Sequence, residues 1–148
     1  MVNINSVVNY LLEKSGFSLT NLKIQKLLYY VYGVCLAATD KGRPFDEQPE
    51  AWQYGPVFPS VYHDLKIYGS QHVRHKILGA VDLANQVVKN IVDAVYEFFG
   101  DLSEAVLIRS THKPAAPWAS VYKRGTRRAT IPDETIKQYF QEHVIKKD

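Results

Sequence analysis

The chain of 148 residues is 46% hydrophobic and 22% charged, a composition typical of one globular domain whose core needs no disulfide or metal. No apolar run approaches the roughly 20 residues that span a bilayer, and the first residues lack the basic and apolar segments of a secretory signal. The net charge of +3 is too mild for a dedicated nucleic-acid binder, and a single cysteine, Cys35, does not indicate an oxidising compartment. We therefore expect one domain over residues 1–148, located in the cytoplasm.

Two helices are predicted first, over residues 3–14 and 20–39, where apolar side chains recur at helical spacing. Ser18 or Thr20 can cap the second helix, which is the longer and more apolar of the two. Its predicted buried stripe consists of Ile24, Leu27, Leu28, Val31, Val34, Cys35 and Ala38. Tyrosines at positions 29, 30 and 32 occupy further faces, so we expect this helix to lie at the centre of the fold.

The following segment, residues 45–54, is predicted to form a small β-hairpin or two extended arms. Pro44 and Pro49 allow edge strands at best, because proline cannot donate to a strand ladder. A helix over residues 59–68 comes next, and residues 70–82 are polar and irregular.

Amphipathic patterns predict four further helical segments, over residues 83–99, 101–112, 117–122 and 131–145. In the first of these, the apolar residues in helical register are Ala84, Val87, Val88, Ile91, Val95 and Phe98. Asp101 and Glu104 have the spacing of a capping box at the start of the second. The predicted fold is mainly α, a single compact domain of about six helices with a small β-hairpin or extended arm near residues 45–54.

A concentration of aromatic and backbone-restricting residues marks the stretch from residue 51 to residue 66. Gly55 and Pro56 suit a sharp corner, and Pro59 suits the first turn of the helix that follows. We interpret this corner mainly as a device that turns an extended arm into that helix. If the corner also binds a partner, its contact residues are expected to be Tyr54 and Tyr62.

Candidate catalytic and metal-binding residues are scarce. His72 and His75 lie close together, but no cysteine or carboxylate at ligand spacing completes a metal site. Cys35 falls on the apolar stripe, where a free thiol acts as a small hydrophobe. Phosphate-binding loops and nucleophile elbows are absent from the sequence. We therefore predict no enzymatic activity, no catalytic residues, no metal and no cofactor.

A second concentrated feature covers residues 110–118. Protonated His112 would be favoured at the negative end of a helix dipole. Trp118 supplies a large rigid surface with one N–H donor. This segment either clips two helices together or forms a recognition surface, since tryptophan and tyrosine are enriched at binding hot spots. Residues 123–128 form a basic cluster, which is either a solvated loop or a contact surface for phosphate or an acidic partner.

These features occur in an ordered set of motifs. The set comprises LKIQKLLYY at 22–30, AWQYGPV at 51–57, VYHDL at 61–65, Thr111-His112, Pro117-Trp118, IPDETI at 131–136 and Tyr139-Phe140. In this order and spacing the chain resembles the Panacea antitoxin domain family, the SocA-like and phage-associated GepA-like proteins, over roughly residues 5–145.

The resemblance implies a non-enzymatic bacterial or phage protein that neutralises a toxin encoded by an adjacent gene. Members of the family are paired with unrelated toxin types, so the resemblance does not name the toxin. One branch resembles adaptors that present their toxin to an ATP-dependent protease. Other members carry an added DNA-binding segment, which we do not expect here because the chain extends little beyond the shared domain.

The leading hypothesis is an antitoxin that binds its toxin directly. The predicted contact residues are Tyr54, Tyr62, His112, Trp118, Lys123 and Arg124, and the predicted structural signature is Trp52, Gly55, Pro56, Pro59, Thr111 and Pro117. Two alternatives stay open: a proteolytic adaptor, and a nucleic-acid-binding regulator that uses the basic cluster at 123–128, although nucleic acid and membrane are not the expected partners. Antitoxin activity rests on the resemblance, because a fold or pattern by itself does not establish a function.

Overall fold

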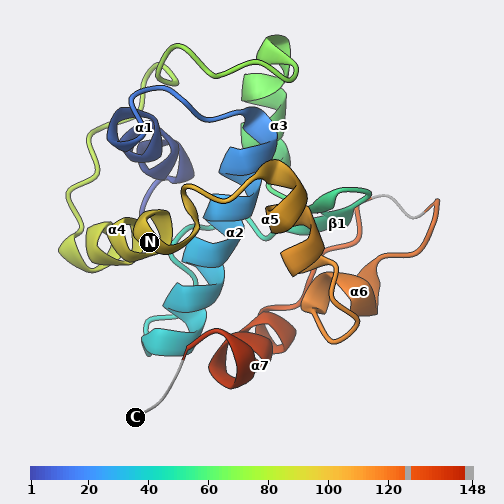
Figure 1. Cartoon of the computed structure of the whole chain (residues 1–148). Coiled ribbons are helices and arrows are strands. Elements are labelled where there is room, and N and C mark those ends of the chain that lie inside the picture. Colours follow the sequence, from blue (N-terminus) through green and yellow to red (C-terminus); the bar gives the residue numbers. More distant parts are fainter. Residues whose placement is uncertain (126–127, 146–148) are drawn as a thin grey trace.

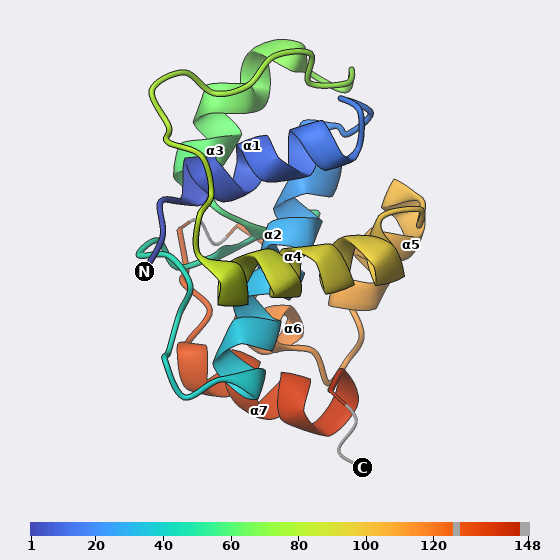
Figure 2. The same cartoon turned by 90° about the vertical axis from the view of Figure 1, so that its left-hand side faces the viewer.

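A single long helix organises the computed structural model, which describes residues 1–125 and 128–145. Helix α2 (Asn21–Ala38) runs through the middle of the molecule, and the other elements surround it (Figures 1 and 2). Its packing partners are α1 (Ile4–Lys14), α3 (Pro59–Leu65), α4 (Gln86–Phe99), α5 (Glu104–Thr111), α7 (Asp133–His143) and strand β2 (Gly55–Val57). Helices α1 and α4 cover one side of α2, and α5 lies with the strands on the opposite side (Figure 1).

The remaining elements are strand β1 (Glu50–Trp52), the short 3-10 helix η1 (Lys66–Tyr68) and helix α6 (Pro117–Val121). The mainly helical fold with a small β element is thus confirmed, with seven α-helices within the described residues. None of the helices in these parts of the chain combines the length and apolar composition that crossing a bilayer requires.

The central position of α2 follows from its composition. Both the aliphatic stripe and the three tyrosines are buried, apart from a half-buried Val34 and an exposed Ala38 at the last position. Of the two predicted caps, Thr20 is the correct one, because its hydroxyl accepts a hydrogen bond from the Lys23 N–H at 3.2 Å. A helix that is apolar on nearly every face must be covered on nearly every face.

Helix α7 closes the lower end of α2 through one close contact. A Cβ atom built at Gly33 would lie only 2.3 Å from the Phe140 ring, so the ring rests directly on the backbone of α2. Phe140 and Ile136 are fully buried there. Glycine is therefore required at position 33 by the close approach of the two helices.

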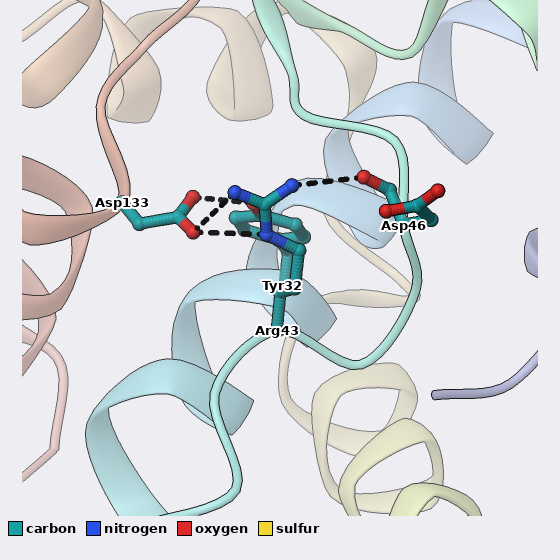
Figure 3. Close-up of polar contacts among 4 residues, drawn as sticks. All are labelled: Tyr32, Arg43, Asp46 and Asp133. Carbon is teal, nitrogen blue, oxygen red and sulfur yellow. Dashed lines mark hydrogen bonds and ion pairs between the residues drawn. The ribbon is translucent and has the colours of Figure 1, made fainter.

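An ion pair holds the start of α7 and the loop after α2 against the central helix (Figure 3). The Arg43 guanidinium contacts a carboxylate oxygen of Asp133 through two nitrogens, each at 3.0 Å, and also donates to the Asp46 carbonyl at 2.9 Å. Tyr32 of α2 donates its hydroxyl to the same carboxylate. Asp133 lies in the first turn of α7, where the helix dipole favours a negative charge.

The β-hairpin differs from the prediction in position and register. Strands β1 and β2 pair antiparallel with Ala51 opposite Pro56, so Gly55, Pro56 and Val57 form a strand and not a corner, and the turn lies at residues 53–54. Strand β1 is also not an edge strand, because the Ala51 N–H donates to the Ala129 carbonyl on its other side at 2.8 Å. That direction makes Ala51 and Pro56 a non-hydrogen-bonded pair, and the missing N–H of proline therefore leaves no ladder bond unmade.

Three helix boundaries also need correction. Helix α4 begins at Gln86 with Asn85 as its cap, because the Asn85 side chain accepts from the Val88 N–H at 3.1 Å. Helix α5 is capped by Ser103 and not by Asp101, since the Ser103 hydroxyl accepts from the Val106 N–H at 3.2 Å. The segment predicted as a helix over residues 59–68 changes from α to 3-10 geometry at its last three residues.

The buried face of α4 is rotated relative to the predicted one. Its fully buried residues are Val88, Val92 and Val95, whereas Val87 and Phe98 are exposed. Because the helix starts at Gln86, Ala84 does not belong to it. The predicted set had helical spacing, but it combined residues of the buried face with residues on the exposed flanks of that face.

Candidate functional site

The two surfaces that the sequence predicts separately form one continuous site. The indole N–H of Trp118, in α6, donates to the Trp52 carbonyl in β1 at 2.6 Å. The His112 ring stacks on Trp118 with centroids 3.7 Å apart and an interplanar angle of 7°, and Trp52 meets Tyr62 edge to face at 4.9 Å. The residues of the predicted corner and those of the predicted clip therefore belong to the same layer of aromatic rings.

A buried lysine lies beneath this layer. Lys26 of α2 is 1% exposed, and its ammonium donates to the Pro56 carbonyl at 3.2 Å. Burial lowers the pKa of Lys26 to about 7, and the negative charge of Glu104 opposes that shift. A lysine of this kind is held in place by the fold even though its charged form is poorly solvated.

Gly55 and Thr111 fit closely around the lysine. Gly55 has φ +115°, and a Cβ atom there would lie 2.8 Å from Lys26 Cε and 2.9 Å from Thr111 Oγ1. The Thr111 hydroxyl donates to the Ile108 carbonyl at 2.9 Å at the end of α5. The site thus requires glycine at position 55 for two reasons, its backbone angle and its lack of a side chain. The predicted signature residues Gly55, Pro56 and Thr111 all contact or approach Lys26.

The expectation that the helix dipole favours protonated His112 is wrong in its net direction. Burial lowers the pKa of its imidazole, and the nearby charge of Lys26 lowers it further. The effect of the helix dipole, which favours the protonated form at the end of α5, is therefore outweighed. The buried Nε2 atom has no hydrogen-bond partner among the described residues.

We expect the His112 imidazole to titrate below the ordinary pKa of 6.5 for both of these reasons. Lys26→Met removes the positive charge but not the burial, so the pKa of His112 should rise in this variant and still lie below 6.5. Ring proton–carbon NMR spectra recorded from pH 4.5 to 8 would follow the titration. An unchanged midpoint in the variant would show that the charge of Lys26 does not reach His112.

A pocket of about 390 Å³ opens beside the lysine. Its lining includes the buried Lys26, Trp52 and Tyr54 of the hairpin, Tyr62 of α3 and Lys66 of η1. We call this the hairpin pocket. Tyr54 is 58% exposed at its rim, whereas Tyr62 is half-buried.

Two buried amides fix the hairpin relative to α2. The Gln25 side chain accepts from the Phe58 N–H at 2.8 Å and donates to Asn21 at 3.0 Å. Asn21 in turn donates to the Tyr62 carbonyl at 3.3 Å. The first bond satisfies the N–H of Phe58, the cap residue before α3, and the last satisfies the Tyr62 carbonyl, which is among the final four carbonyls of that helix. Pro59 occupies the first turn of α3 as predicted.

Most residues of this site lie in a part of the chain that matches a known protein family. The family model described as "Antitoxin SocA-like, Panacea domain" matches residues 24–119, well over half of the chain. The chain belongs to the SocA-like Panacea family. The resemblance noted from the sequence is thus confirmed, and the matched range includes Lys26, the hairpin and the stacked pair His112–Trp118.

A curated relative supports the same assignment to the Panacea family. "Antitoxin SocA" of Caulobacter vibrioides is 30% identical over an alignment of 158 residues, which covers 95% of this chain and 83% of that protein. No solved structure matches the chain.

The other predicted residues of this Panacea chain lie at the margin of the site. Pro117 is buried at the first turn of α6. Lys123 and Arg124 are exposed just beyond Tyr122, whose ring stacks on Trp118 at 4.7 Å. Residues 126 and 127, in the middle of the predicted basic cluster, lie outside the described residues. Cys35 is buried far along α2, and burial raises the pKa of its thiol.

Sequence reasoning missed the three polar residues that build the Panacea site from below, Asn21, Gln25 and Lys26. A signal for Lys26 was available. It precedes Tyr29 and Tyr30 by three and four positions and therefore lies on the same helix face as two tyrosines that the pattern placed near the core. A lysine on an otherwise apolar helix face either extends its ammonium to solvent along that face or is buried with a specific hydrogen-bond acceptor.

Proposed function

We propose that this Panacea protein is an antitoxin that neutralises a cognate toxin, in the cytoplasm, by direct binding through the aromatic surface over Lys26. The observation that carries the proposal is the exposed ring of Tyr54 at the mouth of a pocket walled by Trp52 and Tyr62. Tyrosine and tryptophan in such positions are the residues most enriched at binding hot spots. The name of the Caulobacter relative supports the antitoxin role.

The rigidity of the hairpin supports the same surface. Three hydrogen bonds fix the hairpin and the residue after it to α6 and α2. Trp118 of α6 donates to the Trp52 carbonyl, Lys26 of α2 donates to the Pro56 carbonyl, and Gln25 of α2 accepts from the Phe58 N–H. A surface that is already ordered loses less conformational entropy on binding, so more of the contact energy contributes to affinity.

The proposal is tested by co-expression with the product of the adjacent reading frame. We expect the pair to elute as one complex in size-exclusion chromatography and expect the antitoxin to restore growth. Tyr54→Ala should weaken the complex by about thirtyfold, the effect of losing a hot-spot side chain. The variant should unfold at the same temperature as the parent protein, because the ring is largely exposed.

Phe98→Ala is the matched control, since it also removes an exposed aromatic ring, 81% exposed, from α4 on the other side of α2 (Figure 1). Affinity lost in Phe98→Ala but kept in Tyr54→Ala would contradict the proposed surface. An active toxin with no complex would contradict the proposed function. Toxin that disappears only in cells containing an ATP-dependent protease would indicate an adaptor.

A further inference from the structure

Lys26, which lines the hairpin pocket, has an amine that the fold leaves only partly hydrogen-bonded. A lysine ammonium has three N–H donors, and Lys26 uses one of them, on the Pro56 carbonyl at 3.2 Å. Among the described residues no carboxylate lies within ion-pair distance of it. Glu104 acts on Lys26 through its charge, but the hydrogen bond that it makes is with the Thr20 hydroxyl, at 3.1 Å.

The chemistry of the pocket walls indicates the sign of the missing group. The charged side chains that line the pocket within the described residues are Lys26 and Lys66, and both are positive. Asn21 and Gln25 also line it, but their amides bond each other and the backbone of residues 58–62. The aromatic residues Trp52, Tyr54 and Tyr62 also line the pocket, and the burial of Lys26 at 1% exposure strengthens any charge pairing at its amine.

We propose that the hairpin pocket receives an acidic side chain, Asp or Glu, of the protein partner, and that its carboxylate pairs with the Lys26 ammonium. This inference rests on the proposed antitoxin function and names the chemistry of the toxin residue that enters the site. The pocket also gives specificity, because a partner without the carboxylate would cover Lys26 and leave the donors that Pro56 does not use without acceptors.

Lys26→Met tests the pairing, because methionine keeps the length of the side chain and removes the charge. With the product of the adjacent reading frame as the probe, we expect the variant to bind at least about thirtyfold more weakly in isothermal titration calorimetry. Lys23→Met is the matched control. It makes the same change one helix position outside the pocket lining, and its affinity should stay within about threefold of the parent value.

Proton uptake gives a second readout that a merely structural role would not change. Near pH 8.5 the free protein holds Lys26 mostly neutral, whereas the carboxylate favours the ammonium, so the complex should take up a proton and bind more weakly as the pH rises above 7. The charges of Lys26 and of Glu104 in α5 act on each other, as do those of Lys26 and His112, the residue that follows α5, and Lys66 of η1 lines the same pocket. Proton uptake that remains in Lys26→Met comes from these other groups, because the amine of Lys26 is absent there.

The partner side of the pair provides an independent measurement. Exposed Asp and Glu residues of the toxin are changed one at a time to Asn and Gln. One such change should weaken binding as much as Lys26→Met does, with no further loss when the two are combined. If Lys26→Met failed to fold, this scan of the partner alone would test the pairing. The supporting result would be one acidic position whose substitution abolishes the proton uptake on binding.

Two negative outcomes are distinguishable. If the parent protein binds its partner tightly and Lys26→Met binds it equally well, with the same proton uptake, the acidic contact is overturned and the antitoxin function stands. The absence of any complex with the parent protein would overturn both the proposed function and the inference that rests on it.

Discussion

Replacing Lys26 by methionine should raise the free energy of unfolding by about 2–4 kcal/mol at pH 6. This is the opposite direction to the loss of partner binding that we propose for the same change. The lysine is 1% exposed, and burial lowers its pKa from 10.5 to about 7. A shift of this size corresponds to about 5 kcal/mol of unfavourable burial of the charged form. Methionine avoids that cost but loses the hydrogen bond to Pro56, which reduces the net gain.

The sign of the pH dependence follows from the two states. The folded protein releases the Lys26 proton near pH 7, and the unfolded chain keeps it until about pH 10.5, so the unfolded state binds more protons between these values. The stability of the parent protein relative to the variant therefore rises with pH over this window. The advantage of Lys26→Met should be largest at and below pH 7 and should shrink steadily above it.

Urea unfolding of the two proteins at pH 6, 7 and 8.5 measures this difference directly. Lys23→Met serves as the control for removing a lysine from the same helix, and its stability should change by less than about 0.5 kcal/mol. A Lys26→Met variant that is less stable than the parent protein at pH 6 would show that the ammonium, through its bond to Pro56, stabilises the fold.

Gly55→Ala should cost at least about 3 kcal/mol of stability. The added methyl group would lie 2.8 Å from Lys26 Cε and 2.9 Å from Thr111 Oγ1, and the residue has φ +115°, which alanine rarely adopts. Strained backbone and overpacking each contribute of the order of 1–3 kcal/mol. Chemical denaturation measures the loss.

Gly79→Ala separates the two causes. This glycine also has a positive φ, of +85°, but a methyl group there would meet nothing within 4 Å. Its cost should be about 1 kcal/mol, the backbone contribution alone. Equal effects of the two substitutions would contradict the close packing of Gly55 against Lys26 and Thr111.

The sequence pattern predicts the helices well because their signals are local. The apolar stripe of α2 and its tyrosines indicate burial on nearly every face, and the structure confirms it. The hairpin register could not be obtained in the same way. Pro56 is tolerated in a strand because Ala51 directs its N–H toward Ala129, and that pairing joins segments far apart in the chain.

The site shows the same division. Aromatic residues of the corner and of the clip were both predicted, but their union depends on the bond from Trp118 to the Trp52 carbonyl, which no local pattern encodes. Lys26 was harder to recognise. A lysine in a helix is usually at the surface, and only the tyrosines on its face indicate that this one is not.

The pairing of β1 with residues 129–131 has a consequence for folding during synthesis. The ribosome makes this segment long after β1, and α7, whose Phe140 covers Gly33, later still. Until then the outer edge of β1 offers unpaired backbone groups of the kind that associate with other chains. Nascent chains should thus be most prone to aggregation before residues 129–140 emerge, and β1 on the aromatic surface over Lys26 gains its second pairing partner only at that stage.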